Sequence, residues 1–278
     1  MRLARPLQWS KNFFCYAAVF FGGELGDPAR FWHATLVAMA FCFLSAAVYA
    51  INDSADAERD RLHPTKSSRP VASGRFTAGE ALGLAAVWCV IAFLLVGFLP
   101  APVAVAGWLA AYLILNVGYT LFFKKLLVVD VGVLAFGFVI RVFAGGAAVK
   151  IVPTSWIIIC TYGLAAMLAF GKRRGDLVLL NDGDTPAGSS GYTLRLLDNI
   201  VPVVAILTAV SYGLYCSNRG EPLLIFTVVP VAAGFYRYLR LVSLGYLVNR
   251  PEILLIRDPV IAGGVVLWAV LYTLVIYW

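Results

Sequence analysis

Nine stretches of mostly apolar residues dominate the chain and constrain its fold class. They cover residues 12–23, 32–51, 78–99, 103–123, 127–149, 154–171, 200–217, 223–238 and 259–278. About 20 apolar residues in a helix cross the roughly 30 Å of hydrocarbon in a bilayer. Of the 278 residues, 61% are hydrophobic and 13% are charged, which is about half the charged fraction of a soluble domain. Because the alternation of a β-barrel is absent, we predict an all-α, polytopic membrane protein with about nine transmembrane helices.

The distribution of charge predicts the orientation of the chain. Most of the 22 Lys and Arg residues fall in the N-terminal segment and in the loops after the even-numbered stretches. The N-terminus is therefore predicted to be cytoplasmic and the C-terminus to lie on the opposite side. We expect one domain, residues 1–278, with polar cytoplasmic loops at 52–77 and 172–199. The net charge of +7 then reflects topology and not nucleic-acid binding, and the oligomeric state stays open.

An acidic motif follows the second apolar stretch. It consists of Asn52, Asp53, Asp56 and Asp60, which share an arc of about 100° if the helix continues past Ile51. Like charges held this closely repel one another unless a cation lies among them or one of them is protonated. Carboxylates and substrate phosphate oxygens are the usual ligands of Mg²⁺. We predict that the four residues bind Mg²⁺ and that the three aspartates are catalytic, because a solvated loop does not need its acids on one face.

Polar residues extend this motif in both directions. Ser45 and Tyr49 continue the same helix face into the apolar stretch. After Pro64, Lys66 and Arg69 provide cations that suit phosphate oxygens beyond the reach of a metal. The motif therefore predicts a site for a phosphorylated substrate at the membrane boundary.

Two strings of residues resemble a known family. The first is Asn-Asp-x-x-Asp-x-x-x-Asp with His-Pro-x-Lys-x-x-Arg-Pro after it, over residues 52–70. It is similar to the first aspartate-rich motif of the UbiA superfamily of intramembrane prenyltransferases. Together with the opening Arg5-Pro6-Leu7-Gln8-Trp9-Ser10-Lys11-Asn12, it looks like the branch typified by decaprenyl-phosphate phosphoribosyltransferase. The resemblance covers essentially the whole chain, and it implies a central cavity open to the cytoplasm and to lipid, in a bacterial plasma membrane, with Mg²⁺ at the first motif.

The end of the sixth apolar stretch departs from the pattern of members that use prenyl diphosphates. Those members carry a second Asp-x-x-x-Asp at this position. This chain instead has Lys172, Arg173, Arg174 and Asp176. Lys172 and Asp176 share a helix face, which predicts one pair and leaves Arg173 and Arg174 as surplus positive charge. Asp182 and Asp184 share no helix face, so they do not replace the motif. A lipid monophosphate needs less metal, which favours the phosphoribosyltransferase branch. A topogenic anchor is the alternative.

Arg141 is a charged residue within the fifth stretch, roughly 16 Å along the helix from Asp130. A charge at that depth costs about 2.5–3.5 kcal/mol on insertion scales. We therefore predict that Arg141 faces a polar cavity near substrate anions, with a structural ion pair as the alternative. Lys124, Lys125 and Asp130 resemble the family's basic-then-acidic pattern, or else form a topogenic anchor. Other family positions at cytoplasmic helix ends are matched by Lys11, Arg195 and Asp258.

The resemblance implies transfer of 5-phosphoribose from phosphoribosyl diphosphate to a polyprenyl phosphate, with release of diphosphate. The acceptor oxygen is already anionic, so no strong general base is needed. The predicted substrate-binding residues are Lys11, Tyr49, Asn52, Lys66, Arg69, Lys124, Arg141, Lys172, Arg173, Asp176 and Arg195. One alternative is prenyl transfer from a diphosphate to an aromatic acceptor, against which the missing second motif counts. Another is a transporter, whose charges would lie nearer the membrane midplane.

Overall fold

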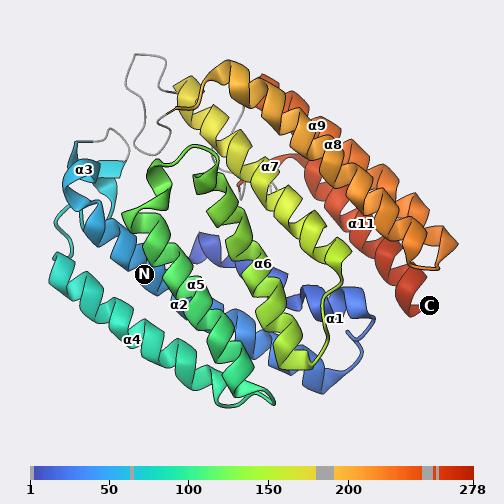
Figure 1. Ribbon diagram of the computed structural model, residues 1–278, viewed down its shortest axis with the longest axis horizontal. Coiled ribbons are helices and arrows are strands. Elements are labelled where there is room, and N and C mark those ends of the chain that lie inside the picture. The colour runs from blue at the N-terminus through green and yellow to red at the C-terminus, as the bar shows by residue number, and fades with distance from the viewer. Residues whose placement is uncertain (1–2, 63–65, 180–190, 246–252, 255–256) are drawn as a thin grey trace. The chain divides into compact units, whose positions relative to one another are not determined.

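The computed structural model describes residues 3–62, 66–179, 191–245, 253–254 and 257–278, and these are almost entirely helical, with no strand among them (Figure 1). Eight helices in this part of the chain are long and apolar enough to cross a membrane. The helices over these spans are α2 (Pro28–Ala55), α4 (Ala78–Val96), α5 (Pro102–Leu121), α6 (Val129–Val149), α7 (Ser155–Leu179), α8 (Leu194–Asn218), η4 (Pro222–Thr227) with α9 (Val228–Ser243), and α11 (Pro259–Tyr277). The predicted all-α membrane fold is confirmed.

The first of the nine apolar stretches differs from the other eight. Its residues lie in a 3₁₀ helix, η1 (Pro6–Tyr16), and a short α-helix, α1 (Ala17–Gly22), so they form no continuous transmembrane α-helix. The eight spans and this irregular N-terminal segment together account for the nine apolar stretches. The central cavity implied by the family resemblance stays a prediction.

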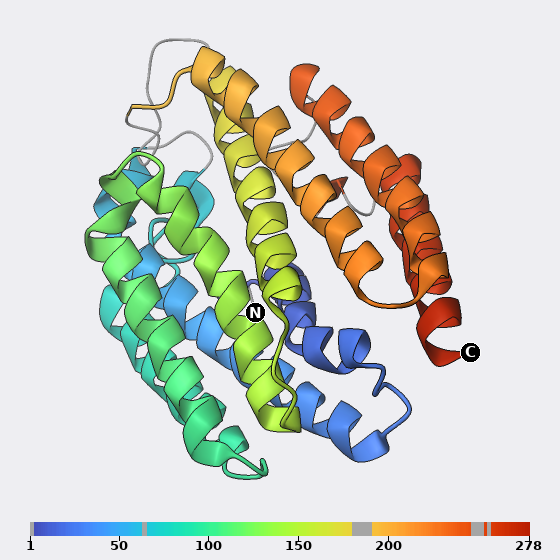
Figure 2. The same cartoon turned by 45° about the vertical axis from the view of Figure 1, so that its right-hand side comes forward.

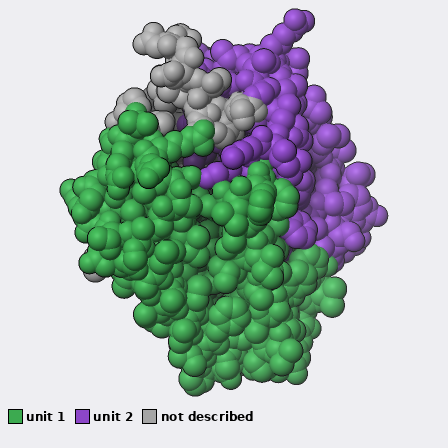
Figure 3. Space-filling view, turned by 60° about the vertical axis from the view of Figure 1, so that its left-hand side comes forward, with its two compact units in different colours: residues 1–123, 140–153 green, residues 124–139, 154–278 purple. Residues whose placement is uncertain are grey.

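The chain divides into two compact units, which Figure 3 shows in different colours. Unit 1 comprises residues 1–123 and 140–153, and unit 2 comprises residues 124–139 and 154–278. Helix α6 contributes its first half to unit 2 and its second half to unit 1. Each unit is built around its own set of packed helices.

In unit 1, α2 is the central helix. It packs along α4 and also contacts α5 and η1. In the most apolar 18-residue segment of α2, 67% is buried, whereas the corresponding value is 22% in α4 and in α5. Most of the apolar surface of α4 and α5 is therefore available to contact lipid. The core joins Phe41 and Leu44 of α2 to Leu109 and Tyr112 of α5 and Ile140 of α6.

Helix α2 carries the acidic motif at its C-terminal end. Asp27 caps its first turn by accepting hydrogen bonds from the backbone N–H groups of Ala29 and Arg30. The helix ends at Ala55, and α3 (Ala57–Arg61) follows after a single non-helical residue, Asp56. Two backbone hydrogen bonds keep the helical spacing across this break. The N–H of Asp56 donates to the carbonyl oxygen of residue 52 at 3.0 Å, and the N–H of residue 60 donates to that of Asp56 at 2.8 Å. The predicted phase of the acids is therefore preserved.

Helix α6 approaches η1 closely at Gly145, where no side chain of the glycine separates the two backbones. A Cβ atom added at Gly145 of α6 would overlap the carbonyl oxygen of Cys15 in η1. This close approach is possible because glycine has no Cβ. It places the second half of α6, which carries Arg141, directly against the N-terminal segment within unit 1.

In unit 2, α7 packs along α8, and α9 packs against α8 and α11 (Figure 2). The core includes Met167, Leu197, Val201, Tyr238 and Ile261. Helix α8 begins after a Thr193 cap and α11 after an Asp258 cap. These caps set where two helices enter the bundle.

Candidate functional site

The end of α2 in unit 1 holds a group of paired acidic and basic side chains. Asp53 is 1% exposed and forms an ion pair with Arg5 from the segment before η1. Arg69 bridges two carboxylates, with its Nη1 2.7 Å from Asp60 Oδ2 and 3.4 Å from Asp53 Oδ1. The Arg5 guanidinium also lies over the Tyr49 ring, 4.8 Å from its centroid. The structure thus brings Tyr49, Asp53, Asp60 and Arg69, which are among the predicted site residues, together with Arg5.

One oxygen of this group is unsatisfied. Asp53 Oδ2 is buried and has no hydrogen-bond partner among the residues that the structure describes. An unpartnered buried acceptor costs about 1–3 kcal/mol, and a cation beside it would remove that cost. Asn52 Oδ1, one residue away, accepts a hydrogen bond of 3.3 Å from the Thr120 hydroxyl. These oxygen donors suit a hard divalent cation such as Mg²⁺.

The carboxylates are not gathered into a complete metal cage. Within the described ranges, no three His, Cys, Asp or Glu side chains are arranged to hold a metal ion. Asp56 is half-buried and occupies the junction between α2 and α3. The guanidinium groups of Arg5 and Arg69 instead supply the positive charge beside Asp53 and Asp60. The oxygen atoms of these residues are of the kind that bind a divalent ion. In this structure the guanidinium groups of arginines balance the negative charge of the carboxylates.

Arg5 is the site residue that sequence reasoning missed. The opening string contained it, but no pattern linked it to an aspartate 48 residues away. Its backbone lies in the left-handed region, with φ 46° and ψ 63°, immediately before Pro6. For a non-glycine residue this conformation costs about 1–2 kcal/mol, so the contacts around Arg5 must hold it there.

Arg141 lies in a separate polar group within unit 1. It is 5% exposed, and its Nε donates a 2.8 Å hydrogen bond to Asn12 Oδ1 of η1. Its Nη2 donates to the Tyr112 hydroxyl at 2.9 Å and to Ser45 Oγ at 3.3 Å. The guanidinium also stacks over the rings of Phe41 and Tyr112. The predicted polar surroundings are present, whereas contact with substrate anions stays a prediction.

Unit 2 has its own buried carboxylate, Asp130, at the start of α6. Asp130 is 1% exposed, and its Oδ2 accepts hydrogen bonds from Nε and Nη2 of Arg173 at 3.0 and 2.8 Å. Its Oδ1 accepts from the Tyr192 hydroxyl at 2.6 Å and from Val131 N at 2.7 Å. The same Tyr192 oxygen accepts from the backbone N–H of Val128, which has a positive φ of 67°. Burial and the hydrogen bond to Asp130 raise the pKa of Tyr192, so it remains a neutral donor.

The expectation that Arg173 and Arg174 carry surplus charge is wrong. Arg173 pairs with Asp130, and Arg174 pairs with Asp198 of α8 through a 2.5 Å hydrogen bond. Both partners lie on other helices, whereas the i, i+4 spacing on one helix face concerns only the acids of α7 itself. The end of α7 therefore presents arginines oriented by carboxylates. A pair between Lys172 and Asp176 stays a prediction.

The remaining predicted residues are distributed over several helical elements. Lys11 is in η1, Lys66 in η2 (Lys66–Ser68), Lys124 in η3 (Phe123–Lys125), and Lys172 and Asp176 in the last turns of α7. Arg195 is exposed in the first turn of α8. Asp182 and Asp184 lie outside the described residues. Substrate contacts of all these residues stay predictions.

Asp258 combines a helix cap with an ion pair. Its Oδ1 accepts hydrogen bonds of 3.1 Å from Val260 N and Ile261 N, and its Oδ2 lies 2.7 Å from Arg237 Nη2. The hydrogen bond from Arg237, aided by those from the backbone, holds the pKa of Asp258 below its ordinary value.

We expect Asp258→Asn to remove a pH-dependent part of the stability. Because the folded-state pKa is lowered, the ion pair stabilises the protein above about pH 4, and this stabilisation is lost as the pH falls through the folded-state pKa. The variant, which keeps an oxygen for the cap, should melt below the wild type at pH 7 and by a smaller margin near pH 3. Thermal denaturation in detergent measures both. An equal difference at the two pH values would contradict the linkage.

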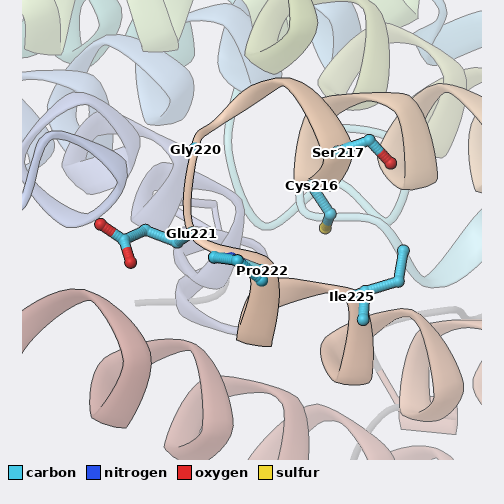
Figure 4. Close-up of a pocket in the computed structure, with 6 residues that line it drawn as sticks. All are labelled: Cys216, Ser217, Gly220, Glu221, Pro222 and Ile225. Carbon is cyan, nitrogen blue, oxygen red and sulfur yellow. The ribbon is translucent and has the colours of Figure 1, made fainter.

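A pocket at the other end of α8 lacks comparable chemistry. It lies at the turn into η4 and is lined by Cys216, Ser217, Gly220, Glu221, Pro222 and Ile225 (Figure 4). The Glu221 carboxylate points away from Cys216 in this view. Arg174 and Asp198 meet near the opposite end of α8, so this pocket is separate from the charged group of unit 2.

Comparison with known proteins identifies the family. The model of the UbiA prenyltransferase family matches residues 12–252. This chain belongs to the UbiA prenyltransferase family. A decaprenyl-phosphate phosphoribosyltransferase of Mycobacterium tuberculosis is 30% identical over 280 residues, covering 96% of this chain and 91% of that protein. One from Corynebacterium glutamicum is 28% identical, covering 100% and 86%.

The UbiA fold is also shared with solved structures. A UbiA homolog from Archaeoglobus fulgidus bound to GPP and Mg²⁺ superimposes with a TM-score of 0.76 at 19% identity, covering 99% of this chain and 98% of that one. At this identity the likeness establishes the fold. The UbiA family protein described here is therefore an integral membrane enzyme of the transferase class.

Proposed function

We propose that this UbiA family protein transfers 5-phosphoribose from phosphoribosyl diphosphate to a polyprenyl phosphate, with Mg²⁺ as cofactor. The observation that carries the proposal is the similarity to decaprenyl-phosphate phosphoribosyltransferases over nearly the full length of both chains. The residues at the end of α7 agree with it, since Lys172, Arg173 and Arg174 occupy the region where a second Asp-x-x-x-Asp would otherwise lie.

The acidic group of unit 1 is assigned to the diphosphate of the donor. Asn52, Asp53, Asp56 and Asp60 would hold Mg²⁺, which supplies charge neutralisation for the departing diphosphate. The buried Asp53 Oδ2, which has no hydrogen-bond partner within the described part of the chain, is the oxygen best placed to gain from a cation. Arg69, 24% exposed and already bridging two carboxylates, can donate to phosphate oxygens.

The cations of unit 2 are assigned to the lipid phosphate. Arg173 is held by Asp130, which fixes the direction of its guanidinium and lowers the entropy lost when it binds an anion. A phosphate acceptor is already anionic, so this arrangement needs no general base. The apolar surfaces of the helices leave the polyprenyl tail in the bilayer. We also propose a bacterial plasma membrane location with a cytoplasmic N-terminus, from the distribution of Lys and Arg.

A direct transfer assay tests this function. Purified protein is incubated with radiolabelled phosphoribosyl diphosphate, decaprenyl phosphate and Mg²⁺, and the label in the organic phase is counted. We expect lipid-linked label that depends on the protein and disappears with a chelator. A parallel mixture contains a polyprenyl diphosphate and an aromatic acid. If product forms only in that second mixture, the proposed function is wrong and the protein catalyses aromatic prenyl transfer.

A further inference from the structure

Two arginines occupy the carboxylates to which the proposed function assigns a metal ion. Arg5 pairs with Asp53, and Arg69 pairs with both Asp53 and Asp60. We propose that Arg5 and Arg69 are internal counter-ions that exclude free Mg²⁺ from these aspartates and admit it only together with a diphosphate group. This inference rests on the proposed metal site and adds to it an order of binding and a role for Arg5.

The burial of the four side chains shows which partners can move. The side chains of Asp53 and Asp60 are 0% and 6% exposed, whereas those of Arg5 and Arg69 are 25% and 24% exposed. The carboxylates belong to α2 and α3, whose backbones are hydrogen-bonded across the acidic motif. Displacement of an ion pair here therefore turns the guanidinium groups toward solvent and leaves the carboxylates in place.

The segment that carries Arg5 is anchored on both sides of it. Leu3 is 2% exposed in the cluster with Ala47, Ala50 and Val71, and Asn12 is 2% exposed and bonded to Arg141. Arg5 itself has the left-handed backbone conformation. A loose tail would relax such a conformation, so the anchors and the ion pair together hold the guanidinium at Asp53.

Charge balance explains why a diphosphate would displace the two arginines from the carboxylates. A bare divalent cation approaching Asp53 meets two positive guanidinium groups, and binding it alone would leave both without their counter-ions. A diphosphate arriving with the metal supplies several anionic oxygens, to which arginine donates paired hydrogen bonds. Asp53 and Asp60 would then be free to hold the metal, and the two arginines would donate to the diphosphate. The site is thereby selective for a metal–diphosphate complex over the metal alone.

The test measures metal binding to Arg5→Gln by isothermal titration in detergent, first with Mg²⁺ alone and then with saturating inorganic pyrophosphate. For the wild type we expect Mg²⁺ to bind at least about tenfold more tightly with pyrophosphate. Arg5→Gln should tighten binding of Mg²⁺ alone by about tenfold and reduce the enhancement by pyrophosphate by about tenfold. Arg69→Gln should change the affinity for Mg²⁺ alone and the enhancement by pyrophosphate in the same directions as Arg5→Gln does.

The matched control is Arg59→Gln, which removes an exposed arginine from α3. It should bind Mg²⁺ as the wild type does under both conditions. If Arg5→Gln and Arg69→Gln leave binding of Mg²⁺ alone unchanged or weaker, with normal melting temperatures, the counter-ion role is wrong even if phosphoribosyl transfer is found. Conversely, tighter binding of Mg²⁺ alone together with a smaller enhancement by pyrophosphate, without any phosphoribosyl transfer, would support this inference and overturn the proposed reaction.

Discussion

Replacing Asp53 with asparagine is expected to reduce transfer of label into the lipid phase by about 1000-fold or more. Asp53 is buried and contacts two arginines, and one of its carboxylate oxygens has no hydrogen-bond partner among the described residues. Asparagine has nearly the same shape, but it lacks the charge that binds a divalent ion. Loss of charge stabilisation at a reacting phosphate typically costs 10²–10³ in rate, and loss of the metal should cost at least the upper end of that range.

The folded state should survive this change. Arg5 and Arg69 are about a quarter exposed, so water can solvate them, and Arg69 retains Asp60 as a partner. The matched control is Glu58→Gln, which removes an exposed acid on α3 from outside the acidic group and should leave activity near the wild-type level. Transfer assays and melting curves in detergent measure both variants. Near-normal transfer by a folded Asp53→Asn protein with Mg²⁺ would refute the assignment of Asp53 as a metal ligand.

The largest expected loss of stability comes from Gly145→Ala. The added Cβ would overlap the carbonyl oxygen of Cys15, and this obstacle is backbone, which cannot rotate away as a side chain can. Overpacking of this kind typically costs 1–3 kcal/mol, and we expect about 3 kcal/mol here. A loss of that size should lower the melting temperature by several degrees. The segment carrying Arg5 and Asn12 should also be displaced from α6, so activity should fall with stability.

Gly107→Ala is the matched control for this prediction. It introduces the same methyl group in the second turn of α5, where no neighbouring heavy atom of the described residues lies within 4 Å of the added Cβ. Alanine is favoured over glycine in a helix by about 1 kcal/mol, so this variant should be as stable as the wild type or more so. Equal melting temperatures for the two variants would show that η1 shifts away from α6 without cost.

The arrangement of the acidic motif could be predicted because it depends on a local repeat. The spacing of Asn52, Asp53, Asp56 and Asp60 places them on one helix face, and the backbone hydrogen bonds at Asp56 preserve that spacing although α2 ends at Ala55. Hydropathy predicted nine apolar stretches, and eight of them lie in helices long enough to span a membrane. It could not show that the first stretch combines part of a 3₁₀ helix with a short α-helix, because composition does not distinguish a lipid-exposed span from a segment packed inside a unit.

The partners of the arginines depended on tertiary structure. Arg173 and Arg174 find Asp130 and Asp198 on other helices, and a pattern within one helix carries no information about such pairs.

The sequence by itself determined that this protein lies in a lipid bilayer, that it is helical and that its acids share one helix face. Each of these follows from local composition and the period of a helix. Only the tertiary structure decided that Arg5 reaches Asp53, that Arg141 binds Asn12, and that Gly145 lets η1 contact α6. These contacts join residues far apart in the chain, and they form because helix packing, and not sequence spacing, brings their side chains together.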